Sequence, residues 1–280
     1  MQGASRDALA GLRDALAQAV DGPSKSAGPD AAALQRLSED LFAVVTLFAG
    51  TASLRRAVSD PALEIDAKVG LVDRLLDGKI GDAALGLVRQ TARSRWSEPR
   101  DVVDALEAIA VEAALSQAEQ EDQLDEVEDQ VFRFERIVDA EPDLRTALTD
   151  RNLPADRKQA LLSRLLDGKV APVTRALVER AVLSPRGRTL ERVLDEFLRL
   201  AALRRSRLVA RVTAAVPLSD EQQSRLADAL AREFGGEVRL QVVVDPSLLG
   251  GLTVRVGDEL LDASVVRQLD TAHRKLTGRS

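Results

Sequence analysis

The residue types that most often carry catalytic or metal chemistry are nearly absent from this sequence. It holds a single histidine, His273, no cysteine, and neither of the phosphate-loop patterns GxxxxGK[ST] and GxGxxG. Nucleophilic triads, histidine or thiolate metal sites and phosphate loops therefore lack their parts. A catalytic pair of carboxylates is not excluded in a chain with 45 acidic residues. No pair in the sequence can be distinguished from carboxylates on the solvated surface. The sequence predicts no catalytic residue, no metal and no cofactor.

Two residues of rare type have structural interpretations. His273 is flanked by basic residues on a predicted terminal helix, and we expect it to be exposed and without a role. Trp96, in the string RSRWSEPR, is predicted to fill the edge of a helical bundle rather than to bind a ligand.

Composition narrows the class of protein and of partner. A chain of 280 residues with 45% hydrophobic content is long enough for two or three folded domains. A net charge of -6 argues against general nucleic-acid binding, and the absence of cysteine is compatible with a reducing cytosol. The longest apolar run, residues 41–49, is far shorter than the roughly 20 residues that a membrane span needs. The amino terminus lacks the apolar stretch of a secretory signal.

The string RLLDGK occurs at residues 74–79 and again at 164–169. The match extends over residues 54–79 and 144–169, where fourteen of twenty-six positions are identical and the shared leucines have helical spacing. Each copy predicts a helix that ends near Asp60 or Asp150, a turn, and a second helix that stops at Asp-Gly. Phe42 and Phe132 keep the same offset of ninety. We interpret the repeat as a duplicated helical module, with coincidence in a Leu-, Arg- and Asp-rich chain as the alternative.

The segment between Pro99 and Pro142 contains no Gly or Pro and predicts one continuous helix, roughly 60 Å long, that joins the two modules. Its acidic run, residues 119–129, is interpreted as a solvated helix face rather than a docking site for a basic partner.

Beyond about residue 206 the pattern becomes α/β. Residues 207–216 and 237–244 are rich in β-branched residues, and residues 253–263 predict two short strands around a Gly-Asp turn. Ser219 and Gln222 form a capping box for a helix that ends at a Gly-Gly pair, and Asp262 is expected to cap a last helix.

The predicted fold is mainly α: duplicated helical bundle modules joined by a long helix, followed by a small α/β domain. The predicted domains are residues 1–112 with the first copy, residues 113–205 with the second copy, and the α/β domain of residues 206–280.

The stretch VRLQVVVDPSLLGGLTVRVG, residues 238–257, is the most specific in the chain. It reads as a strand, an Asp-Pro turn, a Gly-Gly pair suited to positive φ or a bulge, and another strand, which together predict a tight β corner. The stretch also resembles the C-terminal signature of the delta subunits of bacterial F-type ATP synthases, the family of the oligomycin-sensitivity-conferring protein. The signature residues, with the capping aspartate that follows, are Asp245, Pro246, Leu248, Gly250, Gly251, Val254, Val256 and Asp262.

The resemblance covers residues 124–276 well and the amino-terminal helices more loosely. Residues 185–188, PRGR, resemble the end of the family's helical domain. The surplus over a typical member is the first copy of the repeat, which resembles the enlarged delta subunits of actinobacteria. That copy has RSRWSEPR in place of SPRGR and lacks a counterpart of Gly187, so the two copies need not bind the same partner.

The resemblance implies a non-catalytic stator subunit at the cytoplasmic face of the cell membrane. The helical region would hold the alpha-subunit amino termini of the catalytic head, and the C-terminal domain would hold the b subunit of the peripheral stalk. No nucleic acid and no direct membrane span are expected. Two alternatives stay open from the residues alone: a helical-repeat adaptor unrelated to ATP synthase, and an enzyme with an unrecognised carboxylate site.

Overall fold

The structure is a computed structural model, and it describes residues 3–21, 31–205, 208–214, 218–234, 238–244, 252–256 and 259–262. The chain divides into two compact units, Met1–Ala202 and Leu203–Ser280. The described part of the first is helical, and that of the second combines a helix with a sheet. The prediction of a mainly α chain followed by a small α/β region is confirmed.

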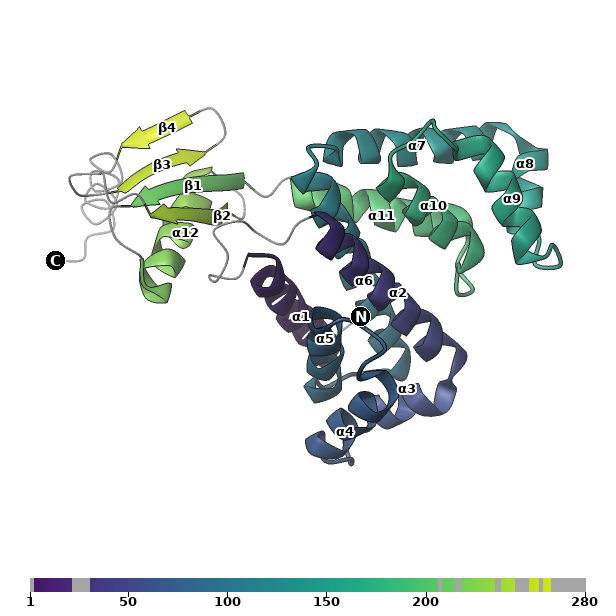
Figure 1. Ribbon diagram of the computed structural model, residues 1–280, viewed down its shortest axis with the longest axis horizontal. Coiled ribbons are helices and arrows are strands. Elements are labelled where there is room, and N and C mark those ends of the chain that lie inside the picture. The colour runs from purple at the N-terminus through teal and green to yellow at the C-terminus, as the bar shows by residue number, and fades with distance from the viewer. Residues whose placement is uncertain are drawn as a thin grey trace. The chain divides into compact units, whose positions relative to one another are not determined.

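The helices of the first unit bury their apolar side chains in one shared core. Figure 1 shows how these helices are arranged. They are α1 (Ala4–Asp21), α2 (Ala31–Gly50), α3 (Ala52–Ser59), α4 (Ile65–Leu76), α5 (Asp82–Arg93), α6 (Pro99–Gln120), α7 (Leu124–Ala140), α8 (Pro142–Thr149), α9 (Ala155–Leu166), α10 (Pro172–Leu183) and α11 (Leu190–Arg205). Within the described residues, no single helix has the length and apolar composition to cross a membrane. The pair α2 and α3, bent by 103°, passes that test jointly.

Helix bounds in this unit repeat at an offset of ninety residues. Helices α3, α4 and α5 begin and end ninety residues before α8, α9 and α10, and α2 ends ninety residues before α7. Burial repeats as well, because Leu76 and Leu166 are buried while Leu75 and Leu165 are partly buried. That the two copies superpose stays a prediction, which these shared bounds support.

Two local features recur in both copies. Gly78 and Gly168 follow α4 and α9 with φ of +69° and +68°, a conformation that glycine adopts without a Cβ clash. At the start of α5, the Gly81 N–H donates to Asp40 Oδ2 at 2.8 Å. At the start of α10, the Ala171 N–H donates to Gln130 Oε1, also at 2.8 Å. Each copy thus ends its second helix and begins its third in the same way.

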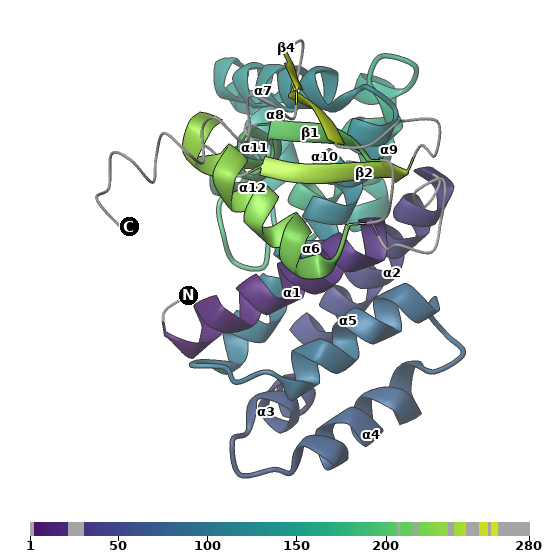
Figure 2. The same ribbon diagram turned by 90° about the vertical axis from the view of Figure 1, so that its left-hand side faces the viewer.

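Helix α6 belongs to both copies. It follows α5 as α11 follows α10, and it precedes α7 as α1 precedes α2. It contacts α1, α2, α3 and α5 of the first copy and α7 and α10 of the second, and both views place it between the two sets (Figures 1 and 2). Fifteen of its twenty-two residues are buried, which is expected of a helix covered on nearly all sides.

The expected single helix between the modules is wrong, because the chain turns between α6 and α7. Asp122 has φ of +54°, a left-handed conformation that aspartate tolerates better than most residues. The Gln123 N–H donates to the Ala118 carbonyl at 2.7 Å and the Asp122 N–H to the Glu119 carbonyl at 3.2 Å. This is the double hydrogen bond of a Schellman helix end, made without the usual glycine.

One expected domain boundary falls inside a helix, and the other falls close to the boundary between the two compact units. Residues 112 and 113 lie inside the buried helix α6, and both helical copies belong to one compact unit. The division of the helical region into two domains stays a prediction. The expected start of the α/β domain at residue 206 lies three residues after the start of the second unit at Leu203.

The second unit contains a four-stranded sheet in the order β2-β1-β3-β4. Its strands are β1 (Leu208–Ala214), β2 (Val238–Val244), β3 (Leu252–Val256) and β4 (Glu259–Asp262). β1 pairs with β2 in parallel and with β3 antiparallel, and β3 and β4 are antiparallel. Helix α12 (Asp220–Phe234) connects β1 to β2 and packs on the sheet (Figure 2).

The start of α12 confirms the predicted capping box. The Ser219 N–H donates to Gln222 Oε1 at 2.9 Å, and the Gln222 N–H donates to Ser219 Oγ at 3.3 Å. Leu226 and Leu230 pack with strand residues in a small core separate from that of the helical unit. The expected Gly-Gly helix end at 235–236, the turn at 257–258 and the last helix from residue 263 lie outside the described residues.

Candidate partner-binding site

The described ranges bring together no set of side chains suited to a metal ion. Within them, no group of three or more His, Asp or Glu residues is placed to hold a metal ion. Trp96 is buried and donates its indole N–H to the Thr91 carbonyl at 2.9 Å, so it fills the bundle as predicted. His273 lies outside the described residues. Grooves and polar networks of the helical unit are therefore the candidate functional features.

A groove of about 450 Å³ lies where α2, α6 and α10 meet. Its apolar lining includes Phe42, Ala114 and Val173, all of them buried. Its polar lining carries both signs of charge, with Glu39 from α2 and Arg180 from α10. An apolar floor with a polar rim suits one face of an amphipathic helix.

The Arg180 side chain closes one wall of this groove. Its guanidinium lies 4.5 Å from the centre of the Phe42 ring and donates to Thr46 Oγ1 at 3.1 Å. Burial lowers the pKa of Arg180, an effect that the negative charge of Glu107 opposes. Since an arginine titrates so far above neutrality, the side chain stays a cation and the contact is a cation–π interaction. It ties α10 of the second copy to α2 of the first.

Phe42 and Phe132 occupy the same position in the two copies but have different surroundings. Phe42 is 4% exposed and Phe132 is 51% exposed. The face of α2 that carries Phe42 is covered within the unit, whereas the corresponding face of α7 is open over the part of the chain that the structure describes. The repeat in the sequence did not predict this difference, because it is set by where each copy lies in the unit.

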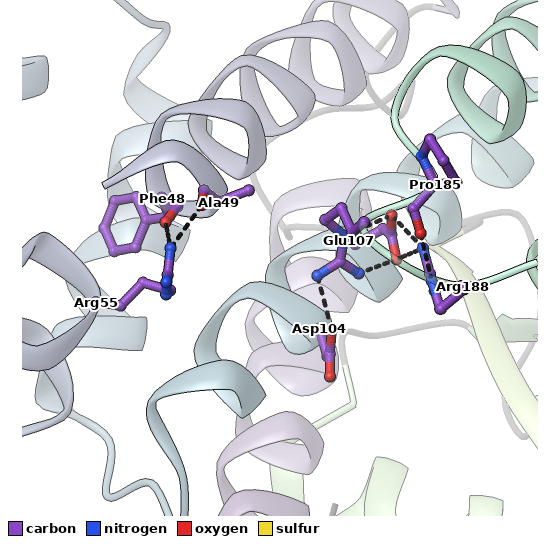
Figure 3. A network of polar contacts seen from close by, with 8 residues as sticks. Phe48, Ala49, Arg55, Asp104, Glu107, Pro185 and Arg188 are labelled. Atoms are coloured by element: carbon purple, nitrogen blue, oxygen red, sulfur yellow. Dashed lines mark hydrogen bonds and ion pairs between the residues drawn. The ribbon is translucent and has the colours of Figure 1, made fainter. Parts of the chain in front are cut away.

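An ion-pair network joins the loop after α10 to helix α6 (Figure 3). Arg186 and Arg188 both bind the buried carboxylate of Glu107, Arg188 at 2.7 Å, and Arg186 also binds Asp104 at 2.7 Å. Burial by itself lowers the pKa of Arg186, but the hydrogen bonds and charges of Glu107 and Asp104 raise that pKa above its ordinary value. The network fixes the second copy to the helix that both copies share.

The loop reaches α6 through an unusual backbone. Arg186 and Gly187 have φ of +52° and +80°, two consecutive left-handed residues. In the first copy Trp96 and Ser97 stand at these positions, and no such network forms among the described residues there. Sequence reasoning used PRGR only as part of a resemblance and missed its contacts. The available signal was a pair of arginines around a glycine, together with acidic residues, Glu107 among them, in an otherwise apolar stretch of helix.

The structure describes part of the predicted C-terminal signature. Val254 lies in β3, fully buried, opposite Val212 of β1. Val256 ends β3, and Asp262 ends β4, so the three described signature residues belong to one hairpin. The signature residues outside the described ranges are Asp245, Pro246, Leu248, Gly250 and Gly251. A role for the signature stays a prediction.

Residues 108–276 match the family described as ATP synthase delta (OSCP) subunit. The chain belongs to this family. The match begins inside α6 and takes in α7–α11 and the second unit. The part shared with the whole delta family therefore contains the second copy of the repeat, and most of the first copy lies ahead of it.

Full-length relatives include the first copy too. The ATP synthase subunit delta of Streptomyces griseus is 46% identical over 278 residues, which are 99% of this chain and 100% of that protein. The subunit of Parafrankia sp. is 45% identical over 278 residues, again 99% and 100% of the two chains. A chain in the cryo-EM structure of the Toxoplasma gondii mitochondrial ATP synthase hexamer matches 61% of this chain and 97% of its own length at 21% identity, with a TM-score of 0.28. The enlarged delta subunit is thus a form that this chain shares with its bacterial relatives.

Membership of the delta family confirms the resemblance read from residues 238–257. The subunits of this family are structural components of ATP synthase, so the chain is not an enzyme. The same relatives, matched from end to end, count against the interpretation as an unrelated helical-repeat adaptor.

Proposed function

We propose that this delta-family subunit joins the catalytic head of an F-type ATP synthase to the b subunit and resists rotor torque at that joint. The first unit holds the head by its alpha-subunit amino termini, and the second unit holds b. Family membership supports the peripheral-stalk role. The division of the chain into a helical unit and an α/β unit supports the division of labour.

The groove at α2, α6 and α10 is the docking position that we propose for the head. Ala176 projects from α10 into this groove and is exposed, so a partner helix has room to approach the backbone there. Apolar side chains of an amphipathic helix would replace water over Phe42 and Val173, while its polar edge would meet Glu39 and Arg180. The family match supports this position in part, because it covers the α10 wall and most of the buried length of α6, whereas α2 lies ahead of it.

To resist torque, the helical unit must not let its two copies move relative to one another. The observation that carries this part of the proposal is the sharing of α6, which leaves no linker between the copies. The ion pairs of Glu107 and the stacking of Arg180 on Phe42 add two further contacts between them. A load applied to one copy passes through packed side chains into the other.

We further propose that the subunit is peripheral to the membrane and lies at its cytoplasmic face, as part of the complex. Family membership supports association with a membrane-bound complex. Attachment would then depend on protein partners.

Deletion of residues 206–280 tests the proposed division of labour. The truncated chain keeps the helical core through α11, so we expect a folded helical protein that still binds the catalytic head. It should lose the b subunit. In membranes that carry the truncated subunit, ATP hydrolysis should continue while proton pumping coupled to it fails, because an untethered head does no net work against the rotor.

The measurements are co-purification with the alpha and b subunits, and quenching of a pH-sensitive dye in inverted vesicles. Normal coupled ATP synthesis with the truncated chain would show that the second unit is not the link to b. Loss of head binding by a truncated chain with unchanged helical circular dichroism would show that the helical unit is not sufficient for the head.

A further inference from the structure

A second cleft, of about 780 Å³, lies within the second helical copy. It is formed by α8, the turn into α9, the end of α10 and the loop into α11. Leu148, Leu153 and Leu190 contribute apolar lining. The charged residues that line it are Arg145, Arg151, Lys158, Arg188 and Glu191. Its volume is within the range of about 300–1,000 Å³ that small-molecule sites occupy, and its lining is predominantly basic.

The Lys158 side chain is the most unusual member of this lining. The residue is only 9% exposed. Over the described ranges its ammonium group makes no hydrogen bond and no ion pair. The stem of the side chain is covered while its ammonium group keeps contact with solvent, so the group is available to an anion that enters the cleft.

Arg145 supplies a second unsatisfied donor to the same cleft. Its Nε is buried and has no hydrogen-bond partner in the described part of the chain. Glu191 Oε1 lies 3.9 Å from this Nε, and Asp139 Oδ1 accepts from Nη2 of the same guanidinium at 3.1 Å. The rest of the guanidinium is held by the Asp139 carbonyl at 2.7 Å, so the side chain has a fixed place at the cleft.

Helix α9 begins at the same cleft. Pro154 and Ala155 line it, and the Pro154 N-cap makes no side-chain capping hydrogen bond. The first N–H groups of a helix carry a partial positive charge, which favours an anion nearby. A largely buried lysine without a protein partner, an arginine with an unsatisfied Nε–H and an uncapped helix start thus line one cleft.

We propose that this cleft binds a small soluble ligand that carries a phosphate group on an apolar body. The phosphate would accept from Lys158 and Arg145 near the start of α9, with Arg151 at the rim. The apolar body would lie on Leu148, Leu153 and Leu190. A phosphate fits because it presents several acceptor oxygens to donors that converge from different elements. The proposal does not depend on the contacts with the head or the b subunit.

The first copy provides a matched control at the same fold position. Lys68 is 6% exposed and, like Lys158, has no hydrogen bond or ion pair within the described ranges. Its surroundings differ in charge, because Pro61 and Glu98 stand where Arg151 and Arg188 stand in the second copy. A purely structural role for the buried lysine would be common to both copies, whereas phosphate binding would belong to the second.

The test is to titrate the full chain with phenyl phosphate and with inorganic pyrophosphate. Binding is measured by calorimetry and by NMR of methyl-labelled leucines. We expect phenyl phosphate to bind the wild-type chain with a Kd of about 1 mM or tighter and to shift the Leu148 and Leu153 methyl signals. Lys158→Met should weaken this binding at least about tenfold, and Lys68→Met less than about twofold, since only the first removes a phosphate donor. Arg151→Gln is the second variant, for use if Lys158→Met does not fold, because Arg151 is at an exposed turn position. We expect Arg151→Gln to weaken binding several-fold.

Three results would overturn the proposal. One is the absence of heat and of methyl shifts with both probes at about ten times the expected Kd. Another is equal binding by the wild-type chain and by a folded Lys158→Met or Arg151→Gln variant. The last is equal affinity for sodium sulfate and phenyl phosphate, which would mark the cleft as an adventitious anion site only.

Discussion

The Arg188 guanidinium lies 2.7 Å from the Glu107 carboxylate, and this ion pair fastens the loop after α10 to the helix that both copies share. Arg186 binds the same carboxylate from the same loop. Two arginines of the second copy thus converge on one buried acid of the shared helix, and we expect the stiffness of the helical unit to depend on that acid.

Replacement of Glu107 by Gln should destabilise the helical unit by about 3 kcal/mol, because it leaves two partly buried guanidinium groups without their shared counter-ion. The measurement is urea unfolding followed by circular dichroism. Asp104→Asn is the matched control. Asp104 binds Arg186 but its side chain is 46% exposed, so its loss should cost less than about 1 kcal/mol. Equal losses in the two variants would show that burial of the Glu107 pair is not what matters.

Ala176→Glu should weaken binding of the catalytic head at least about tenfold, since it places a charge in the groove where an apolar helix face would dock. Ala176 is exposed, so the fold should tolerate the change. Gly86 occupies the same position in α5 of the first copy, with open space around it. Gly86→Glu should leave head binding within about twofold if the second copy holds the head. The reverse outcome in a pull-down with the alpha subunit would assign the head to the first copy.

Gly168→Ala should cost about 1 kcal/mol, because alanine must then adopt a left-handed conformation. No neighbouring atom lies within 4 Å of the added Cβ, so the cost comes from the backbone alone. Gly86→Ala should have the opposite effect on stability. It lies inside α5, also in open space, and alanine should stabilise the helix by up to about 1 kcal/mol. Thermal unfolding of both variants checks the signs, and a stabilised Gly168→Ala would contradict the assigned φ.

Glu135→Gln should make the helical unit more stable at neutral pH. Burial raises the pKa of Glu135, and the negative charges of Asp195, Asp139 and Glu191, with a hydrogen bond to Asp195, raise it further. The pKa of Glu135 is higher in the folded state than in the unfolded state, so protonation of Glu135 stabilises the folded state. This stabilisation is complete below the unfolded pKa. That contribution is lost as the pH rises through the folded pKa.

The amide removes this loss, so the melting temperature of Glu135→Gln should exceed that of the wild type by about 2 °C at pH 7.5, with the gain shrinking toward pH 4. Glu141→Gln, at an exposed position on the end of α7, serves as the control and should show little change at either pH. A gain that is the same at both pH values would mean that charge at Glu135 is not its cause.

Much of the local structure followed from the sequence for physical reasons that act over a few residues. The Asp-Gly pairs at residues 77–78 and 167–168 ended helices because glycine enters the left-handed region freely. The Ser219 and Gln222 capping box began a helix because two side chains satisfy two backbone N–H groups locally. The one local failure was Asp122, where a helix end formed without the residue that usually marks it.

The sequence by itself determined the repeat, its helix bounds, the α/β end and the resemblance to the delta family, because these depend on residue type and spacing along the chain. Only the tertiary structure decided that α6 is shared, that Phe42 is covered while Phe132 is open, and that Glu107 receives two arginines from the loop after α10. Each of these depends on contacts between residues about eighty or more positions apart, which no local pattern encodes. Burial of the lysine recurs at Lys68 and Lys158 and so follows the repeat, whereas the basic cleft around Lys158 depends on residues that α8, α10 and α11 bring to it.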